Sequence, residues 1–275
     1  MALFECHMFS KELFSSVTVN VILPTPNAGM EPGNDKATLP RDGEKYPVLY
    51  LLHGFSADCT DWLRGSAIER YAQARHLAVV MPSGGNSFYQ DLPSGAHYAG
   101  FVLDELPAFV RSVFPISAKR EYNYIAGLSM GGYGAVMLAL RRPSQYSAMA
   151  SLSAPLTSLR ETFSEELISS VNMPVKGFME EAFGSGFANY TPETDDIPTL
   201  LTNALKAGVQ VPRLYQCCGT EDPVYGPNIA FRDFARTLDF DYTFTEGPGV
   251  HDFDFWDPYI KKIIDWIDPD EGFVI

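Results

Sequence analysis

The sequence has few cysteines and few basic residues for its length. Its 275 residues include four cysteines, and 20 lysines and arginines stand against 34 acidic residues, which gives a formal net charge of −14. The cysteines lack the paired spacing of a metal site, and Cys217 and Cys218 fall in a run that predicts a buried strand. A negative charge of this size repels nucleic acid and anionic membrane surfaces. We therefore expect a small-molecule partner, with no nucleic acid and no membrane partner.

The sequence also lacks an apolar run long enough to span a bilayer. Its first residues, MALFECHMFSKELF, have no basic segment and carry charged residues where a signal peptide would need an apolar core. Together with the cysteine content, this favours a reduced protein of the cytoplasm. A hydrophobic content of 46% is enough for one large domain over residues 1–275, and it is compatible with a homo-oligomer.

Short apolar runs alternate with helical patterns along the chain. Helical spacing of apolar residues occurs at 98–113 and 255–267, for example. Strands that are separated by helices predict an α/β fold with a mostly parallel sheet, covered by helices on both faces. Such sheets place ligand sites beyond the carboxyl ends of their strands. The predicted strands lie at 16–23, 46–52, 77–82, 121–127, 146–154, 211–219 and 240–246.

Two segments do not fit this alternation. Residues 24–45 are polar and rich in proline and glycine, which predicts a long loop. Residues 155–210 are rich in Phe, Gly, Pro and acidic residues. We expect this second segment to form a cap-like excursion over the carboxyl ends of the strands, ending in a helix at 199–207.

The stretch GLSMGGYG follows a predicted strand and precedes a predicted helix. It contains G-x-S-x-G, a weak pattern by itself, but its setting is that of a nucleophile elbow, in which Ser129 projects above the sheet. Gly127 and Gly131 would permit the tight turn, while Gly132 and Gly134 would let the helix approach the sheet. The alternative is a glycine-rich turn without chemistry. The setting favours Ser129 as a nucleophile.

A serine nucleophile needs a histidine base and an acid that orients the histidine. His251 lies in a loop after the last predicted strand, at the same sheet edge as Ser129. The alternative is a surface histidine that caps the next helix. Asp222 directly follows the strand at 211–219, and the order serine, acid, histidine is that of the hydrolases. Glu221 is the neighbouring candidate, but its side chain would point elsewhere.

The remaining acidic residues near these positions have other interpretations. Asp195 and Asp196 are predicted to cap the helix that follows them. Asp252 and Asp254 stand beside His251, as in some metal sites, but no second histidine or cysteine cluster supports a metal. We expect no metal and no cofactor.

The run YPVLYLLHGF leaves a buried strand at a His-Gly turn. The backbone N–H of Phe55 can there face the N–H of Met130, and two fixed donors aimed at one oxygen form an oxyanion hole. His53 is expected to support the turn rather than to react. Phe55 and Met130 are also candidates for an acyl pocket, although aromatic residues near a sheet are more often core residues. The other candidate pocket residues are Trp62, Phe253 and Trp256.

Four segments, LLHGFSADCTDW, GLSMGGYGA, GTEDPVYGPN and GVHDFDFW, resemble the esterase D group of the α/β-hydrolase superfamily. The resemblance is strongest to its bacterial tributyrin esterase branch, which is similar to S-formylglutathione hydrolases and feruloyl esterases, and it covers about residues 16–267. It implies a catalytic triad of Ser129, Asp222 and His251, with the N–H groups of Phe55 and Met130 as oxyanion hole. A tryptophan commonly follows the His-Gly turn in this group, as Trp62 does here.

Three functions follow from these observations. The first is a serine carboxylesterase for short-chain acyl esters, including feruloyl or acetyl esters of plant origin. The second is a thioesterase of the S-formylglutathione type, with the same triad. The third is a binding protein that keeps the fold without turnover, and an intact set of Ser129, Asp222 and His251 argues against it.

Overall fold

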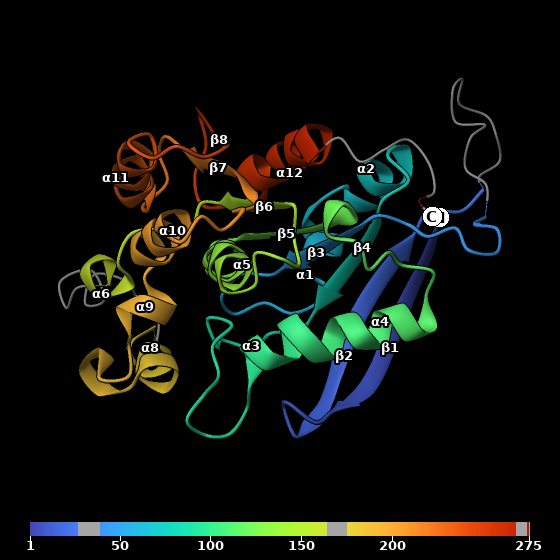
Figure 1. Cartoon of the computed structure of the whole chain (residues 1–275), viewed down its shortest axis with the longest axis horizontal. Coiled ribbons are helices and arrows are strands. Elements are labelled where there is room, and N and C mark those ends of the chain that lie inside the picture. The colour runs from blue at the N-terminus through green and yellow to red at the C-terminus, as the bar shows by residue number, and fades with distance from the viewer. Residues whose placement is uncertain (27–38, 164–174, 268–273, 275) are drawn as a thin grey trace.

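The computed structural model describes residues 1–26, 39–163, 175–267 and 274. An eight-stranded sheet crosses the molecule in the order β1-β2-β4-β3-β5-β6-β7-β8 (Figure 1). The β1–β2 and β2–β4 pairs are antiparallel and the other pairs are parallel. The strands are β1 (Ala2–Ser10), β2 (Ser15–Leu23), β3 (Val48–Leu52), β4 (Ala78–Pro82), β5 (Asn123–Leu128), β6 (Ala148–Leu152), β7 (Arg213–Gly219) and β8 (Tyr242–Gly247).

Helices cover both faces of the sheet (Figure 1). Those that flank the central strands are α1 (Asp61–Gly65), α2 (Ile68–Ala74), α3 (Tyr98–Gly100), α4 (Leu106–Val113), α5 (Met130–Arg141), α11 (Tyr225–Ala235) and α12 (Phe253–Ile267). Two short turns add a π-helix η1 (Phe101–Glu105) and a 3-10 helix η2 (Arg120–Tyr122). The predicted α/β fold with a mostly parallel sheet is confirmed, and all seven predicted strands are present.

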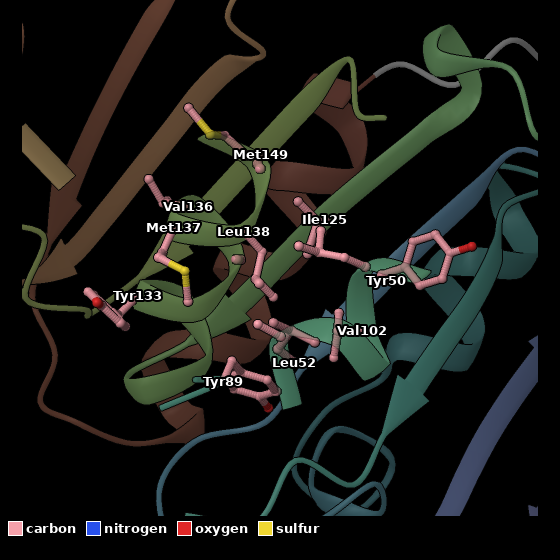
Figure 2. Close-up of a cluster of buried hydrophobic side chains, with 14 of the residues drawn as sticks. Tyr50, Leu52, Tyr89, Val102, Ile125, Tyr133, Val136, Met137, Leu138 and Met149 are labelled. Carbon is pink, nitrogen blue, oxygen red and sulfur yellow. The ribbon is translucent and has the colours of Figure 1, made fainter. Parts of the chain in front are cut away.

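Two hydrophobic clusters lie on opposite faces of the sheet. The larger packs α4 and α5 against one face, and Figure 2 shows part of it, with side chains of α5 directed toward those of β3 and β5. The smaller packs α2 and α12 against the other face. β3, β4, β5 and β6 are buried along their whole length, and β3 and β4 appear in the sequence as continuous apolar runs.

The sequence did not predict the first strand or the break in the helix at 98–113. β1 forms the outer edge of the sheet and pairs only with β2 in the described part of the chain. Its polar and apolar residues are both largely exposed, so it has no buried apolar run. The expected single helix over 98–113 is divided by the π-helical turn η1.

The excursion at 155–210 is helical where it is described. It contains α6 (Leu159–Thr162), α8 (Val175–Phe183), η3 (Ser185–Phe187), α9 (Pro192–Asp195) and α10 (Ile197–Lys206). Residues 164–174 of this excursion, and 27–38 of the predicted loop at 24–45, lie outside the described residues. No described helix is long and apolar enough to cross a membrane.

Candidate active site

Ser129 occupies a strained turn between β5 and α5. Its φ of +50° and ψ of −120° lie in a region that side-chain-bearing residues rarely adopt. Neighbouring glycines make this turn possible: a Cβ added to Gly127 would lie 2.3 Å from the carbonyl oxygen of Gly131, and one added to Gly131 would lie 2.5 Å from that of His53. The turn therefore has the geometry of a nucleophile elbow.

The two following glycines have different neighbours. A Cβ on Gly132 would lie 2.8 Å from the Cβ of Ala154 and 2.9 Å from the Oγ of Ser151, so this glycine does allow α5 to approach the sheet. A Cβ on Gly134 would instead lie 2.4 Å from the ring of Tyr89, which belongs to a loop. The expectation that Gly134 serves the helix–sheet contact is therefore wrong.

Ser129, His251 and Asp222 form one hydrogen-bonded chain. The Nε2 of His251 lies 3.0 Å from the Oγ of Ser129, and its Nδ1 lies 2.9 and 3.0 Å from the two carboxylate oxygens of Asp222. The Asp222 side chain is fully buried, while that of His251 is about one-third exposed. Because a carboxylate only accepts, Nδ1 carries the proton and Nε2 is left to accept the hydroxyl proton of Ser129. This arrangement can activate a serine for nucleophilic attack.

Glu221, the neighbouring candidate acid, binds the loop before His251 rather than the histidine itself. Its carboxylate accepts a 2.7 Å hydrogen bond from the N–H of Gly249, and its own N–H donates to the carbonyl of Gly249 at 3.1 Å. The hydrogen bond from Gly249 lowers the pKa of the Glu221 carboxyl. Glu221 thus ties the end of β7 to the histidine loop, while Asp222 faces the imidazole.

The His-Gly turn after β3 lies directly against the elbow. A Cβ on Gly54 would lie 3.6 Å from the Cβ of Ser129. His53 is buried, its Nδ1 donates to the carbonyl of Gly54 at 2.7 Å, and its Nε2 accepts from the N–H of Gly84 at 2.8 Å. Burial lowers the pKa of His53, which favours this neutral, doubly bonded imidazole. His53 therefore holds the turn in place.

The backbone N–H groups of Met130 and Phe55 are the two candidate oxyanion donors. Met130 follows Ser129 in the chain, whereas Phe55 belongs to the His-Gly turn that lies against Ser129. Met130 is the first residue of α5, where backbone N–H groups have no partner within the helix. Within the part of the chain that the structure describes, neither the N–H of Met130 nor that of Phe55 donates to another residue. Both are thus available to a ligand oxygen.

A cavity of about 450 Å³ opens beside Ser129 and His251. Phe55, Phe253 and Trp256 line it, together with Leu128 and residues of the loop and helix after β3. The ring of Trp256 meets that of His251 edge to face, with centroids 4.9 Å apart. A cavity of this size suits a small ligand.

Two of the expected pocket residues are not among those that line this cavity. Trp62 is buried behind it: its Nε1 donates to the carbonyl of Leu52 at 3.0 Å, and its ring packs edge to face on Phe253, with centroids 5.5 Å apart. Met130 is also buried and does not line the cavity. Trp62 therefore supports Phe253 from behind.

The polar side of the cavity was not predicted from the sequence; it is formed by Asp58, Thr60, Asp61 and Arg64. Hydrogen bonds from Thr60 lower the pKa of the Asp58 carboxyl, whereas burial raises that of Asp61. All four residues belong to the stretch LLHGFSADCTDWLR, in which charged residues closely follow the His-Gly turn. That spacing was the signal that could have identified them.

The remaining candidate acids have structural contacts. Asp196 caps α10 by accepting from the N–H of Thr199, as predicted. Asp195 was expected to share this role, but its buried carboxylate pairs with Arg141 at 2.8 Å. The carboxylate of Asp252 accepts from the N–H of Asp254 at the start of α12. Among the described residues, no group of three His, Cys, Asp or Glu side chains could hold a metal ion.

The chain is similar to known esterases and serine hydrolases. The Esterase family model matches residues 10–264. An acetyl esterase of Caldicellulosiruptor saccharolyticus is 32% identical over 274 residues, which cover 97% of this chain and 98% of that protein. The chain is also similar to two solved structures from Staphylococcus aureus, each 31% identical. Substrate-bound FphF, a fluorophosphonate-binding serine hydrolase, has a TM-score of 0.82, covering 98% of this chain and 99% of that one. The S-formylglutathione hydrolase FrmB has a TM-score of 0.81, covering 97% and 98%.

Proposed function

The chain belongs to the Esterase family of α/β-hydrolases and is a carboxylesterase, and from this premise we propose that Ser129, His251 and Asp222 are its catalytic triad. The hydrogen-bonded chain from Ser129 through His251 to Asp222 is the observation that carries the proposal. The proposed substrates are short-chain acyl esters such as tributyrin or acetate esters.

The reaction follows from the roles of these groups. His251 Nε2 takes the hydroxyl proton of Ser129 as its Oγ attacks the ester carbonyl, and the N–H groups of Phe55 and Met130 stabilise the oxyanion that forms. Asp222 holds the imidazole in the tautomer with Nδ1–H and stabilises the imidazolium. His251 then protonates the leaving alcohol, and a water molecule repeats the sequence on the acyl-enzyme.

Three observations support a short acyl chain and a small alcohol. The cavity of about 450 Å³ is at the lower end of the range for small-molecule sites. Its aromatic side, with Phe55, Phe253 and Trp256, offers apolar surface, and its polar side carries the carboxylates of Asp58 and Asp61. The relative from Caldicellulosiruptor saccharolyticus is described as an acetyl esterase.

A thioesterase of the S-formylglutathione type is the second candidate. It is supported by the 31% identity to the S-formylglutathione hydrolase of Staphylococcus aureus. The two cavity carboxylates argue for the oxygen ester, because glutathione carries two carboxylates of its own and like charges repel.

We also propose that residues 1–275 form one catalytic domain, with 155–210 as a small cap. Phe178 of α8 supports this, because its ring packs edge to face on that of Phe55, with centroids 5.2 Å apart.

We also propose that the enzyme is cytoplasmic, because buried free thiols such as those of Cys217 and Cys218 persist in the reducing cytoplasm.

A substrate panel tests the proposed specificity. It compares kcat/KM for acetyl, butyryl, decanoyl and feruloyl esters and for S-formylglutathione, with Ser129→Ala to measure the background. We expect the acetyl and butyryl esters to give the highest values. A higher value for S-formylglutathione than for every oxygen ester would overturn the proposed specificity in favour of the thioesterase.

A further inference from the structure

The outer edge of β1 is a long strand edge without a partner. β1 is the terminal strand of the sheet, and it pairs with β2 over its whole length, from Ala2 opposite Leu23 to Ser10 opposite Ser15. No strand within the described residues pairs with its other side. One row of backbone N–H and C=O groups is therefore left open, and such an edge is a template for pairing with another chain.

Exposed apolar side chains gather at this edge. Eight large hydrophobic residues are exposed in the described part of the chain, and four of them belong to β1 and the turn that follows it. Leu3 is 48% exposed, Phe9 57% and Phe14 83%. The fourth is Phe4, whose ring packs against Phe114 at the end of α4. A concentration of this kind marks an interaction surface.

The side chains of β1 alternate between two faces. Cys6 and Met8 pack against the larger hydrophobic cluster, on the side of α4. Glu5 and His7 lie on the opposite, open face, where the Nε2 of His7 is 3.0 Å from Glu5 and its Nδ1 is 3.2 Å from the hydroxyl of Thr18. Leu3 and Phe9 share the open face because side chains repeat every second residue in a strand.

We propose that β1 is a homodimer interface, in which it pairs with β1 of a second copy, antiparallel about a two-fold axis at Cys6. In this register all nine residues of β1 are paired. Leu3 faces Phe9 of the second copy and Glu5 faces its His7, and each of these contacts occurs twice because the interface is isologous. The two eight-stranded sheets then join into one continuous sheet.

The charged side chains and the alternation of side chains along β1 favour the register with its axis at Cys6 over registers shifted by one residue or more. A one-residue slip would direct facing side chains to opposite faces of the sheet. An axis at Glu5 would bring two Glu5 carboxylates together, and an axis at His7 would place Glu5 opposite Phe9. The axis at Cys6 alone pairs the acidic residue with the imidazole, and it also gives the longest overlap of the strand.

The oligomeric state is the first test. Sedimentation equilibrium of the full chain should give twice the monomer mass of 30.5 kDa at micromolar concentration. His7→Glu places a carboxylate opposite Glu5 of the other copy, twice per dimer, and should weaken dimerisation about tenfold or more. Glu5→Lys combined with His7→Glu restores opposite charges and should recover the dimer. Val209→Lys, at an exposed apolar position outside β1, is the matched control and should leave it unchanged.

Cross-linking at Cys6 tests the register itself. Directly opposed residues of an antiparallel pair have Cα atoms about 4.5–5.5 Å apart, which lies within the range that a disulfide spans. Diamide should therefore take two electrons and two protons from two Cys6 thiols and yield a covalent dimer, which Cys6→Ser abolishes. The other three cysteines are buried.

Three results would overturn the proposal. They are a monomer at all concentrations up to about 100 μM, a dimer that His7→Glu does not weaken, and a dimer that gives no Cys6 cross-link. Ester hydrolysis by each variant, measured in parallel, verifies that it is folded, because β1 contributes no residue to the cavity beside Ser129.

Discussion

The Nε2 of His251 lies 3.0 Å from the Oγ of Ser129, although 122 residues separate them in the chain. Two local structures bring them together: the turn between β5 and α5 directs Ser129 beyond the sheet, and the loop after β8 carries His251 to the same edge. Each depends on residues that touch neither reacting atom, such as Gly131 and Glu221.

Asp222 and Glu221 are adjacent carboxylates with different expected effects on catalysis. Asp222→Asn should lower kcat by roughly 10⁴-fold, because an amide can stabilise the wrong tautomer of His251 and cannot stabilise the imidazolium. Glu221→Gln keeps an oxygen that can accept from the N–H of Gly249 and should leave kcat near that of the wild type. Steady-state kinetics on one butyryl ester measures both. Equal losses in the two variants would contradict the assignment of Asp222 as the acid.

The glycine at the start of the elbow should be intolerant of any side chain. Gly127→Ala places a Cβ 2.3 Å from the backbone oxygen of Gly131, which cannot rotate away, so the free energy of unfolding should fall by about 3 kcal/mol or more. Gly177 in α8 is the control, since a Cβ there meets nothing within 4 Å. Gly177→Ala should raise the free energy of unfolding by about 0.5–1 kcal/mol. Urea denaturation measures both, and similar values would contradict the crowding at Gly127.

Asp58 and Asp61, on the polar side of the cavity, should affect stability in opposite directions. Burial raises the pKa of Asp61 above 3.8, so its contribution is favourable below that pH and is lost as the pH rises through the folded-state pKa. Asp61→Asn should therefore stabilise the protein near pH 7 and have less effect near pH 4. Hydrogen bonds from Thr60 lower the pKa of Asp58, so its contribution is present above pH 3.8 and is lost as the pH falls below it.

Asp58→Asn should accordingly destabilise the protein near pH 7. Denaturation midpoints of the two variants and of the wild type, measured at both pH values, are sufficient for the comparison. The same sign of change in both variants at pH 7 would show that the carboxylates do not differ in this way.

The central part of the fold was predictable from the sequence because its strands are buried on both faces. β3 and β4 are continuous apolar runs whose pattern does not depend on distant contacts. β1 was not predictable in this way, since its residues are largely exposed and its pairing with β2 is the main feature that defines it as a strand. The break at η1 has no sequence signal that we can identify.

The residues of the candidate site could be predicted because each of them closely follows a strand that the sequence pattern indicates. Ser129, Asp222 and His251 follow strands, and the order of the strands along the chain brings their ends to one edge. Whether a side chain turns toward the cavity or away from it depends on three-dimensional packing. Trp62 was therefore assigned to the pocket although it lies behind Phe253, and Asp61 was overlooked although it lines the cavity.

Covalent labelling of Ser129 tests the central claim most directly. The purified protein is treated with a fluorophosphonate, its intact mass is measured, and the modified peptide is sequenced by mass spectrometry. One adduct per chain, located on Ser129 and absent from Ser129→Ala, with loss of ester hydrolysis in proportion to labelling, is the predicted result. Labelling of a different residue, or wild-type rates of hydrolysis in Ser129→Ala, would contradict the account.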